Sequence, residues 1–350
     1  MNFVEVKEAK MFFQNRKRCF IVAEVSGNHG QNFGRAVRMI KMAKACGADA
    51  VKFQCYTPDT MTIDVSNKYF RIKHAKWGGQ SLYQLYKKAY TPWRWFKRLK
   101  NITDDLGLVF FATAFDKTSV DFLEELGVEF HKIASFELTD LPLIEYVAKT
   151  KKPLILSTGM ATRREIREAV DLAKESGAGD VSLLKCVSSY PACPQEMNLS
   201  TIADMKARFG CTVGLSDHSL GIGASVAAVC LGASIIEKHF ILSSKQNTPD
   251  SFFSLEPREL KELVSNIRIA ERSIGGIRYG PNNKEKENLI FRRSLFAAQD
   301  MKKGEMISMR NMRCVRPANG IPPKYYKALL GRKIKVKVKK GTPLSWSMVR

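Results

Sequence analysis

The chain has 350 residues, of which 45% are apolar and 26% charged, a balance that excludes a disordered chain and a chain made mostly of membrane-spanning segments. Its 57 Lys and Arg residues outnumber 34 Asp and Glu residues, which gives a net charge of +23. Sixteen of the basic residues and two of the acidic ones lie in residues 291–350. Such a charge suits nucleic-acid phosphates or an acidic small substrate. Because no nucleic-acid-binding motif accompanies it, we expect a small acidic ligand and no nucleic acid.

The eight cysteines contain no CxxC pair, and no secretory signal is recognisable, so we expect reduced thiols and a cytoplasmic protein. Residues 219–236 carry no charged side chain. Their apolar character is diluted by Gly, Ala and Ser, which is typical of a buried helix that runs into a buried strand rather than of a membrane span. We therefore expect no association with a membrane.

Along the chain, eight short apolar runs each precede an amphipathic segment. The predicted strands are 20–25, 50–54, 108–112, 130–134, 153–156, 181–186, 211–215 and 234–237. The predicted helices are 33–46, 92–106, 117–126, 141–149, 162–176, 199–209, 222–231 and 257–274. Strands that alternate with helices form parallel βαβ units, and eight units predict an α/β fold of the (β/α)8 TIM-barrel type. The alternative, a doubly wound open sheet, usually has a glycine-rich dinucleotide turn after its first strand, which is missing here.

The chain is predicted to contain two domains. Residues 1–276 form the barrel, residues 277–290 a linker, and residues 291–350 a small β-rich module. Within this module, residues 334–339 alternate apolar residues with lysines, which predicts a strand with its lysines on one solvated face.

Polar residues stand near the ends of the predicted barrel strands, where barrel enzymes carry their catalytic groups. Lys52 and Gln54 alternate with apolar residues and therefore share one face of the second strand. Lysines inside apolar strands need an anionic partner. We expect a site for a ligand with phosphate and carboxylate groups, formed by Lys52, Lys132 and Lys238 with the hydroxyls of Thr113, Ser135, Ser157 and Ser216. The alternative is that the lysines form internal ion pairs with Glu24 and Glu237.

Two histidines, His218 and His239, follow adjacent strands of the predicted barrel. Imidazoles at neighbouring strand ends lie close enough to share one divalent metal ion. The alternative is that each imidazole is only hydrogen-bonded within the core.

Six strings in the barrel region resemble the sialic acid synthase family, whose members condense phosphoenolpyruvate with an acetamido sugar to give nonulosonic acids. They are residues 23–30 (AEVSGNHG), 52–54 (KFQ), 132–135 (KIAS), 156–160 (LSTGM), 214–218 (GLSDH) and 237–240 (EKHF). Residues 293–320 resemble the antifreeze-like (SAF) domain of the same family. The resemblance covers nearly the whole chain.

The resemblance implies roles for matching positions. His218 and His239 would bind a divalent ion, Mn²⁺ or Mg²⁺. Arg316 would reach from the SAF domain of a partner subunit into the barrel mouth, in a homodimer with exchanged SAF domains. The sugar and the reacting carbon would face Glu24, Gln54, Tyr190 and Asp250. Phosphoenolpyruvate would be held by Lys52, Thr113, Lys132, Ser135, Ser157 and Ser216, and Ser188 would also bind substrate.

Residues 82–86, 89–93, 135–140 and 249–257 are most similar to the branch of the family that makes pseudaminic acid. The expected sugar is therefore 2,4-diacetamido-2,4,6-trideoxy-L-altrose. Phe136 stands where N-acetylneuraminate synthases tend to carry Gly, and Ser188 stands where they carry Asn. Thr248 and Ala318 also depart from the usual family pattern, and affect the expected sugar geometry more than the chemistry.

Three alternatives remain open. One is an N-acetylneuraminate or legionaminic acid synthase with an N-acetylmannosamine-type substrate. Another is a barrel that condenses phosphoenolpyruvate with a sugar phosphate, which would need an additional arginine cluster at its mouth. The third is a non-catalytic basic binding protein that has kept the fold.

Overall fold

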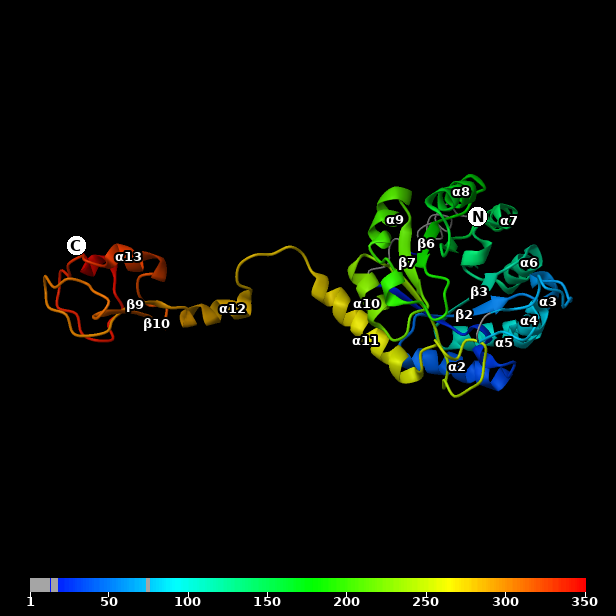
Figure 1. Ribbon diagram of the computed structural model, residues 1–350, viewed down its shortest axis with the longest axis horizontal. Helices are drawn as coiled ribbons and strands as arrows, with labels where there is room; N and C mark the ends of the chain where they lie inside the picture. The colour runs from blue at the N-terminus through cyan, green and yellow to red at the C-terminus, as the bar shows by residue number, and fades with distance from the viewer. Residues whose placement is uncertain (1–12, 14–17, 74–75) are drawn as a thin grey trace. The chain divides into compact units, whose positions relative to one another are not determined.

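The computed structural model describes residue 13, residues 18–73 and residues 76–350. The chain divides into two compact units at Gly275 and Gly276 (Figure 1). Each unit has its own hydrophobic core, and each is described by itself below. None of the helices in the described ranges is long and apolar enough to cross a membrane.

The first unit is a closed barrel of eight parallel strands, which confirms the predicted TIM-barrel fold (Figure 1). Strand β1 pairs in parallel with β2 on one side and with β8 on the other. The strands are β1 (Phe20–Glu24), β2 (Ala50–Cys55), β3 (Val109–Ala114), β4 (His131–Ile133), β5 (Leu154–Ser157), β6 (Val181–Cys186), β7 (Thr212–Asp217) and β8 (Ile235–His239).

Eight helices surround the barrel because each carries an apolar stripe that packs on the outer face of the strands. They are α2 (Phe33–Cys46), α5 (Phe96–Asp105), α6 (Lys117–Leu126), α7 (Leu141–Ala148), α8 (Arg163–Glu175), α9 (Thr201–Phe209), α10 (Gly223–Cys230) and α11 (Pro257–Ile274). Helix α8 begins at a capping box of Thr162 and Glu165. Short 3₁₀ turns occupy η1 (Ser26–His29), η2 (Trp93–Trp95), η3 (Ser135–Glu137) and η4 (Pro194–Glu196).

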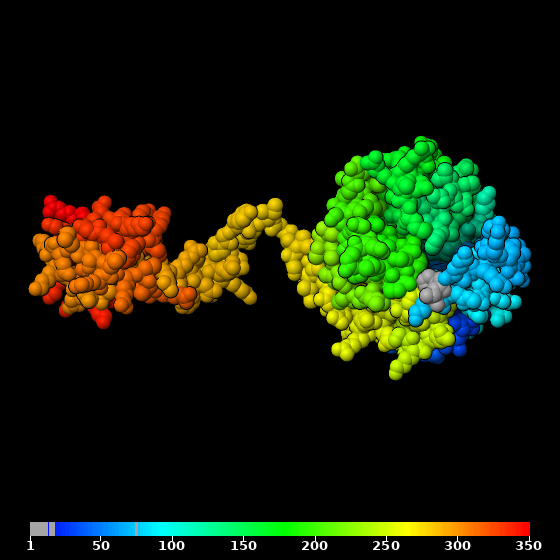
Figure 2. Space-filling view, in the orientation of Figure 1, coloured from blue at the N-terminus to red at the C-terminus, as the bar shows by residue number. Residues whose placement is uncertain are grey.

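A long insertion separates β2 from α5. No regular structure was predicted for it from the sequence, whereas the structure contains two helices there, α3 (Pro58–Met61) and α4 (Leu82–Ala89). In Figure 2 this insertion, coloured light blue to cyan, forms one side of the rim of the barrel unit. Each helix begins at a capping box, of Thr57 and Thr60 in α3 and of Ser81 and Gln84 in α4.

The interior of the barrel is divided into an apolar layer and a polar layer. The apolar layer contains aromatic and aliphatic side chains, and the ring of Phe13 contacts Phe20 at 5.6 Å and Phe130 at 5.1 Å between centroids. Because side chains alternate along a strand, two residues further on the same interior faces carry polar groups, such as Lys132 after Phe130. The polar layer therefore lies toward the carboxyl ends of the strands, where TIM-barrel active sites are found.

The second unit contains a small antiparallel sheet in which β9 (Ser294–Ala297) pairs with β10 (Met312–Val315). Its helices and 3₁₀ turns are α12 (Asn283–Glu287), η5 (Asn288–Phe291), η6 (Pro323–Tyr325), α13 (Tyr326–Leu329) and η7 (Trp346–Met348). The prediction of a strand at 334–339 is wrong, because Ile334 and Val338 form only isolated bridges. Val336, which lies between them, is 47% exposed. The buried positions are thus four residues apart rather than two.

Candidate active site

The barrel mouth contains a buried charge cluster centred on Lys52. Its Nζ lies 3.1 Å from Oε2 of Glu24 and 3.3 Å from Oε1 of Glu237, and it donates a hydrogen bond of 2.8 Å to Oγ1 of Thr113. These residues meet because β1 pairs with both β2 and β8, which places Glu24 opposite Lys52 and His239. The internal ion-pair alternative therefore holds for Lys52.

The pKa values of the two carboxyl groups of this cluster are shifted in opposite directions, since burial raises the pKa of Glu24 while Lys52 and Lys132 outweigh burial and lower that of Glu237. Burial and the negative charge of Glu237 raise the pKa of Glu24 to about 7, against the opposing effect of Lys52. Burial also disfavours the charged form of Lys52, but Glu237 and Glu24 outweigh it and raise the pKa of this lysine. Apart from the ion-pair contact of Oε2 with Lys52, neither carboxylate oxygen of Glu24 has a polar partner within the described part of the chain, so Oε1 is available to a ligand.

Lys132 is the cation of the mouth that lies among neutral partners. Its Nζ donates to Oγ of Ser157 and to the carbonyl oxygen of Ile133, both at 2.7 Å. Burial, reinforced by the positive charge of Lys52, lowers the pKa of Lys132 to about 8. A buried lysine without a carboxylate at contact distance is a suitable anchor for an anionic ligand.

The expectation that Lys238 joins these lysines is wrong. Its Nζ donates to Oδ2 of Asp217 at 2.9 Å and to the carbonyl oxygen of Ser219, outside the barrel interior. Because side chains alternate along β8, Glu237 and His239 face the mouth while Lys238 faces the surrounding helices. The predicted anion site therefore keeps Lys52 and Lys132 and loses Lys238.

Hydroxyl groups gather around Gly159, which follows β5. The backbone N–H of Gly159 donates to Oγ of Ser135 at 3.0 Å. A Cβ atom at this position would lie 2.1 Å from Oγ of Ser188 and 2.8 Å from Oγ of Ser135. Gly159 is thus required for the close approach of the two hydroxyls. Ser216, another serine of the predicted anion site, donates a hydrogen bond of 3.2 Å to Oε1 of Glu237.

The two predicted metal ligands are neighbours, with a distance of 5.3 Å between the ring centroids of His218 and His239. Nδ1 of His218 lies 2.9 Å from the carbonyl oxygen of Val187. Nδ1 of His239 has no hydrogen-bond partner in the described residues and lies 3.7 Å from Oδ2 of Asp250. Burial, together with the charge of His218, holds the pKa of His239 well below its ordinary value. His239 is therefore a neutral imidazole with a free nitrogen lone pair.

No group of three or more His, Cys, Asp or Glu side chains that could hold a metal ion occurs in residues 13, 18–73 and 76–350. The sulfur of Cys186 lies 3.7 Å from Nδ1 of His218 and 3.7 Å from Oγ of Ser188.

A cavity of about 390 Å³ adjoins the imidazole of His239. Its polar wall contains three of the predicted residues, Gln54, Tyr190 and Asp250, together with His239. The ring of Tyr190 lies 4.4 Å from that of His218, and Asp250 accepts a hydrogen bond from Ser26. The rest of the wall is mostly apolar and includes Tyr56, Met61, Ile72, Trp77, Leu82, Leu85, Tyr86, Ala89, Phe115 and Phe136.

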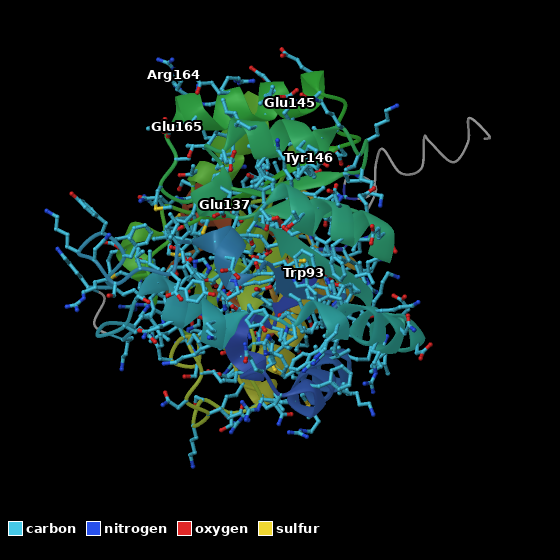
Figure 3. The ribbon with its side chains drawn as sticks, turned by 90° about the vertical axis from the view of Figure 1, so that its right-hand side faces the viewer. Trp93, Glu137, Glu145, Tyr146, Arg164 and Glu165 are labelled. Carbon is cyan, nitrogen blue, oxygen red and sulfur yellow. The ribbon has the colours of Figure 1, made fainter. Side chains whose placement is uncertain are left out.

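Two residues of this wall, Trp77 and Glu137, were not predicted as site residues. Glu137 is largely buried, which raises its pKa to about 7, and its Oε2 has no hydrogen-bond partner within the described residues. In Figure 3, Glu137 lies toward the centre of the barrel unit, whereas Glu145 of α7 and Arg164 of α8 lie in the outer helical layer. The position of Glu137 in η3, four residues after the end of β4, was a usable signal, but nothing in the sequence around Trp77 indicated a ligand.

Arg316 belongs to the second unit, where it is exposed and shares a concave surface with Arg310 and Arg313. The expectation that it enters the barrel mouth of a partner subunit stays a prediction.

A closed parallel barrel with buried carboxyl groups, lysines and imidazoles at the carboxyl ends of its strands defines an enzyme of the (β/α)8 class. The NeuB family profile matches residues 39–279, and the SAF domain profile matches residues 292–350. The chain belongs to the NeuB family, which confirms the resemblance noted in the sequence.

Similar proteins include a pseudaminic acid synthase of Campylobacter jejuni serotype O:2, which is 42% identical over 95% of this chain and 97% of that protein. A pseudaminic acid synthase of Helicobacter pylori is 41% identical over 93% of this chain and 96% of that protein. Among solved structures, the N-acetylneuraminic acid synthetase of Leptospira borgpetersenii in complex with citrate has a TM-score of 0.69 and 35% identity, and the match covers 78% of this chain and 90% of that one.

Proposed function

We propose that the protein condenses phosphoenolpyruvate with 2,4-diacetamido-2,4,6-trideoxy-L-altrose to give pseudaminic acid and inorganic phosphate. The relatives named as pseudaminic acid synthases and the family resemblance of the barrel motifs support this proposal. The single observation that carries it is a group of buried side chains at the barrel mouth. Lys52, Lys132 and several hydroxyls lie there together with two imidazoles and a cavity whose wall is mostly apolar.

Phosphoenolpyruvate carries a phosphate and a carboxylate, and the lysines and hydroxyls of the mouth suit both. Lys132 has only neutral direct hydrogen-bond partners, so an anion gains a charge-assisted hydrogen bond there without displacing a carboxylate. Further hydroxyl groups come from Thr113, Ser135, Ser157, Ser188 and Ser216. The close approach of the Ser135 and Ser188 hydroxyls over Gly159 suits a small group that accepts several hydrogen bonds.

A divalent ion, Mn²⁺ or Mg²⁺, fits His218 and His239. The His218 ring is oriented through Nδ1 by the carbonyl of Val187, an outer contact typical of metal-binding histidines, and His239 has an unpaired Nδ1. Two imidazole ligands leave further coordination positions to waters and substrate oxygens. When bound there, such an ion supplies Lewis-acid polarisation of an aldehyde carbonyl.

The condensation forms a bond between C3 of phosphoenolpyruvate and the aldehyde carbon of the sugar. Positive charge then develops at C2 of the former enol ester, and the carboxylate form of Glu24 stabilises it in a water-poor site. Water adds at C2, and the C–O bond to phosphate breaks, so that the phosphate leaves with its bridging oxygen. Lys52 and Lys132 bind the departing anion.

The apolar part of the cavity supports a deoxy, diacetamido sugar. Aromatic and aliphatic side chains suit the C6 methyl group and the acetamido methyl groups. A sugar with more free hydroxyls would place some of these hydroxyls against the apolar wall without hydrogen-bond partners. Gln54, Tyr190 and Asp250 provide polar contacts at the opposite wall. An N-acetylmannosamine-type substrate, as used by N-acetylneuraminate or legionaminic acid synthases, is the alternative.

The quaternary structure that we propose is a homodimer in which Arg316 of one subunit completes the barrel mouth of the other. Its support is the family resemblance and the exposure of this guanidinium group on the second unit.

A substrate panel tests the function. The purified protein is incubated with phosphoenolpyruvate, Mn²⁺ and single sugars, including the 2,4-diacetamido trideoxy sugar and N-acetylmannosamine, and phosphate release is measured. We expect release with the diacetamido sugar at least about tenfold faster than with N-acetylmannosamine, since one misplaced group changes rates by this much or more. Preference for N-acetylmannosamine would support the alternative synthase, and the absence of release with every sugar would support the non-catalytic binding protein.

A further inference from the structure

A buried ion pair behind the two imidazoles joins the ends of β7 and β8. Asp217 and Lys238 are direct partners in the register of these strands, and their side chains are 0% and 1% exposed. Each immediately precedes a histidine of the proposed metal site. The pair faces the helical layer, so it does not contact a ligand in the barrel mouth.

Both oxygens of Asp217 and two of the three N–H groups of Lys238 are used in hydrogen bonds near the strand ends. Oδ1 of Asp217 accepts from the backbone N–H of Ser219 at 2.8 Å and from its hydroxyl at 2.6 Å. Oδ2 accepts from Ser225 of α10 at 2.6 Å and from Lys238 at 2.9 Å. Lys238 donates a second hydrogen bond to the carbonyl oxygen of Ser219. The residues on both sides of His218 are therefore fixed to the residue that precedes His239.

Stability alone does not account for these charges. Well-packed apolar side chains replace buried ion pairs with little loss of stability, and often with a gain. A directional network, unlike apolar packing, fixes the spacing and the register of the two strand ends. Two ligands that share one ion need such fixed spacing.

We propose that Asp217 and Lys238 are positioning residues that set the separation of the His218 and His239 imidazoles for one divalent cation. The proposal rests on the metal site of the proposed function. It assigns to these two side chains an effect on metal affinity that a purely structural ion pair would not have.

The test is the dissociation constant of Mn²⁺, measured by the EPR signal of the free ion with the chelator-treated full chain, together with the melting temperature. The main variant is Lys238→Met combined with Asp217→Leu, which leaves no uncompensated charge. We expect it to melt near the wild-type temperature and to bind Mn²⁺ at least about tenfold more weakly. The isosteric Asp217→Asn is the second variant, with the same expected loss of affinity.

Lys152→Met is the matched control, because it removes a partly buried ion pair of 2.7 Å with Glu124 on another side of the barrel. It should leave Mn²⁺ affinity unchanged. Wild-type affinity in the double variant or in Asp217→Asn, at any melting temperature, overturns the proposal. A wild-type chain that binds no Mn²⁺, or a His218→Ala variant that binds it as well as the wild type, overturns the metal site and this proposal together.

Discussion

At the scale of single residues, the barrel mouth balances two carboxyl groups against one lysine. Glu24 and Glu237 flank Lys52. One of the two acids therefore retains its proton more readily than the same carboxyl group would in water. The acid with the raised pKa, Glu24, has the Lys52 ammonium group as its only close donor among the described residues. A ligand that develops positive charge next to it would stabilise the ionised form.

Replacing Glu24 by Gln removes this negative charge and keeps the shape of the side chain. We expect kcat to fall about 100-fold or more, since groups that stabilise developing charge in dry sites contribute on this scale. Mn²⁺ affinity should remain within about twofold of wild type. Steady-state kinetics and metal titration provide the check, with Glu125→Gln on the exposed face of α6 as the control. Turnover near the wild-type rate would refute the role.

His29 gives a prediction about acid stability. The neutral ring accepts a hydrogen bond from the backbone N–H of Gln31 at Nδ1 and has Thr91 at 2.9 Å from Nε2. Burial, with the nearby charge of Arg35, lowers the pKa of His29 from 6.5 to about 4. The unfolded chain therefore binds a proton first as the pH falls. The stabilisation is complete above about pH 6.5 and is lost progressively toward pH 4, up to about 3 kcal/mol.

The variant His29→Gln cannot gain this charge. Denaturant unfolding of both proteins between pH 7 and pH 4 should show a smaller loss of stability in the variant. Equal pH dependence in the two proteins would show that His29 is not the group responsible.

At the scale of helices and strands, the insertion between β2 and α5 supplies the apolar wall of the cavity. Trp77 belongs to this insertion, and its indole N–H donates to the carbonyl oxygen of Pro249 at 2.8 Å. Its ring lies 5.7 Å from Tyr190 and 5.9 Å from Phe252. The insertion is thereby tied to the segment that carries Asp250.

Trp77→Ala should raise the KM for the diacetamido sugar about tenfold, because it removes a large apolar surface from the pocket. The KM for phosphoenolpyruvate should stay unchanged, since the lysines and hydroxyls are untouched. Tyr69→Ala is the control, because Tyr69 belongs to the same insertion and is 76% exposed. An equal rise in the KM of both substrates would contradict the assignment of Trp77 to the sugar pocket.

The predictability of the elements follows from their periodicity. All eight barrel strands were located, because parallel strands buried on both faces form apolar runs bounded by turns. The helices α3 and α4 were missed, since short segments specified by their caps have no long apolar period. Lys238 was misplaced, although the alternation that directs Lys52 into the mouth directs Lys238 out of it. Trp77 approaches Pro249 across 172 residues, a contact that no local pattern indicates.

At the scale of the whole molecule, the proposed dimer makes each active site depend on two subunits. A Glu24→Gln subunit has a defective barrel and an intact Arg316, and an Arg316→Ala subunit has the reverse. Random exchange of the two variants would restore one site in each hybrid dimer, or about a quarter of wild-type activity. The measurement is phosphate release before and after the subunits are mixed and re-equilibrated. If activity stays at the level of the separate variants although hybrids form, Arg316 does not act in the partner's barrel.

The most direct test of the central claim follows the bridging oxygen of phosphoenolpyruvate. The protein is given phosphoenolpyruvate labelled with ¹⁸O at the C–O–P bridge, Mn²⁺ and the 2,4-diacetamido trideoxy sugar, and both products are analysed by mass spectrometry. We predict one nonulosonic acid for each phosphate, with the label in the phosphate. Label that stays off the phosphate, or phosphate formed without a new nine-carbon acid, would contradict the account.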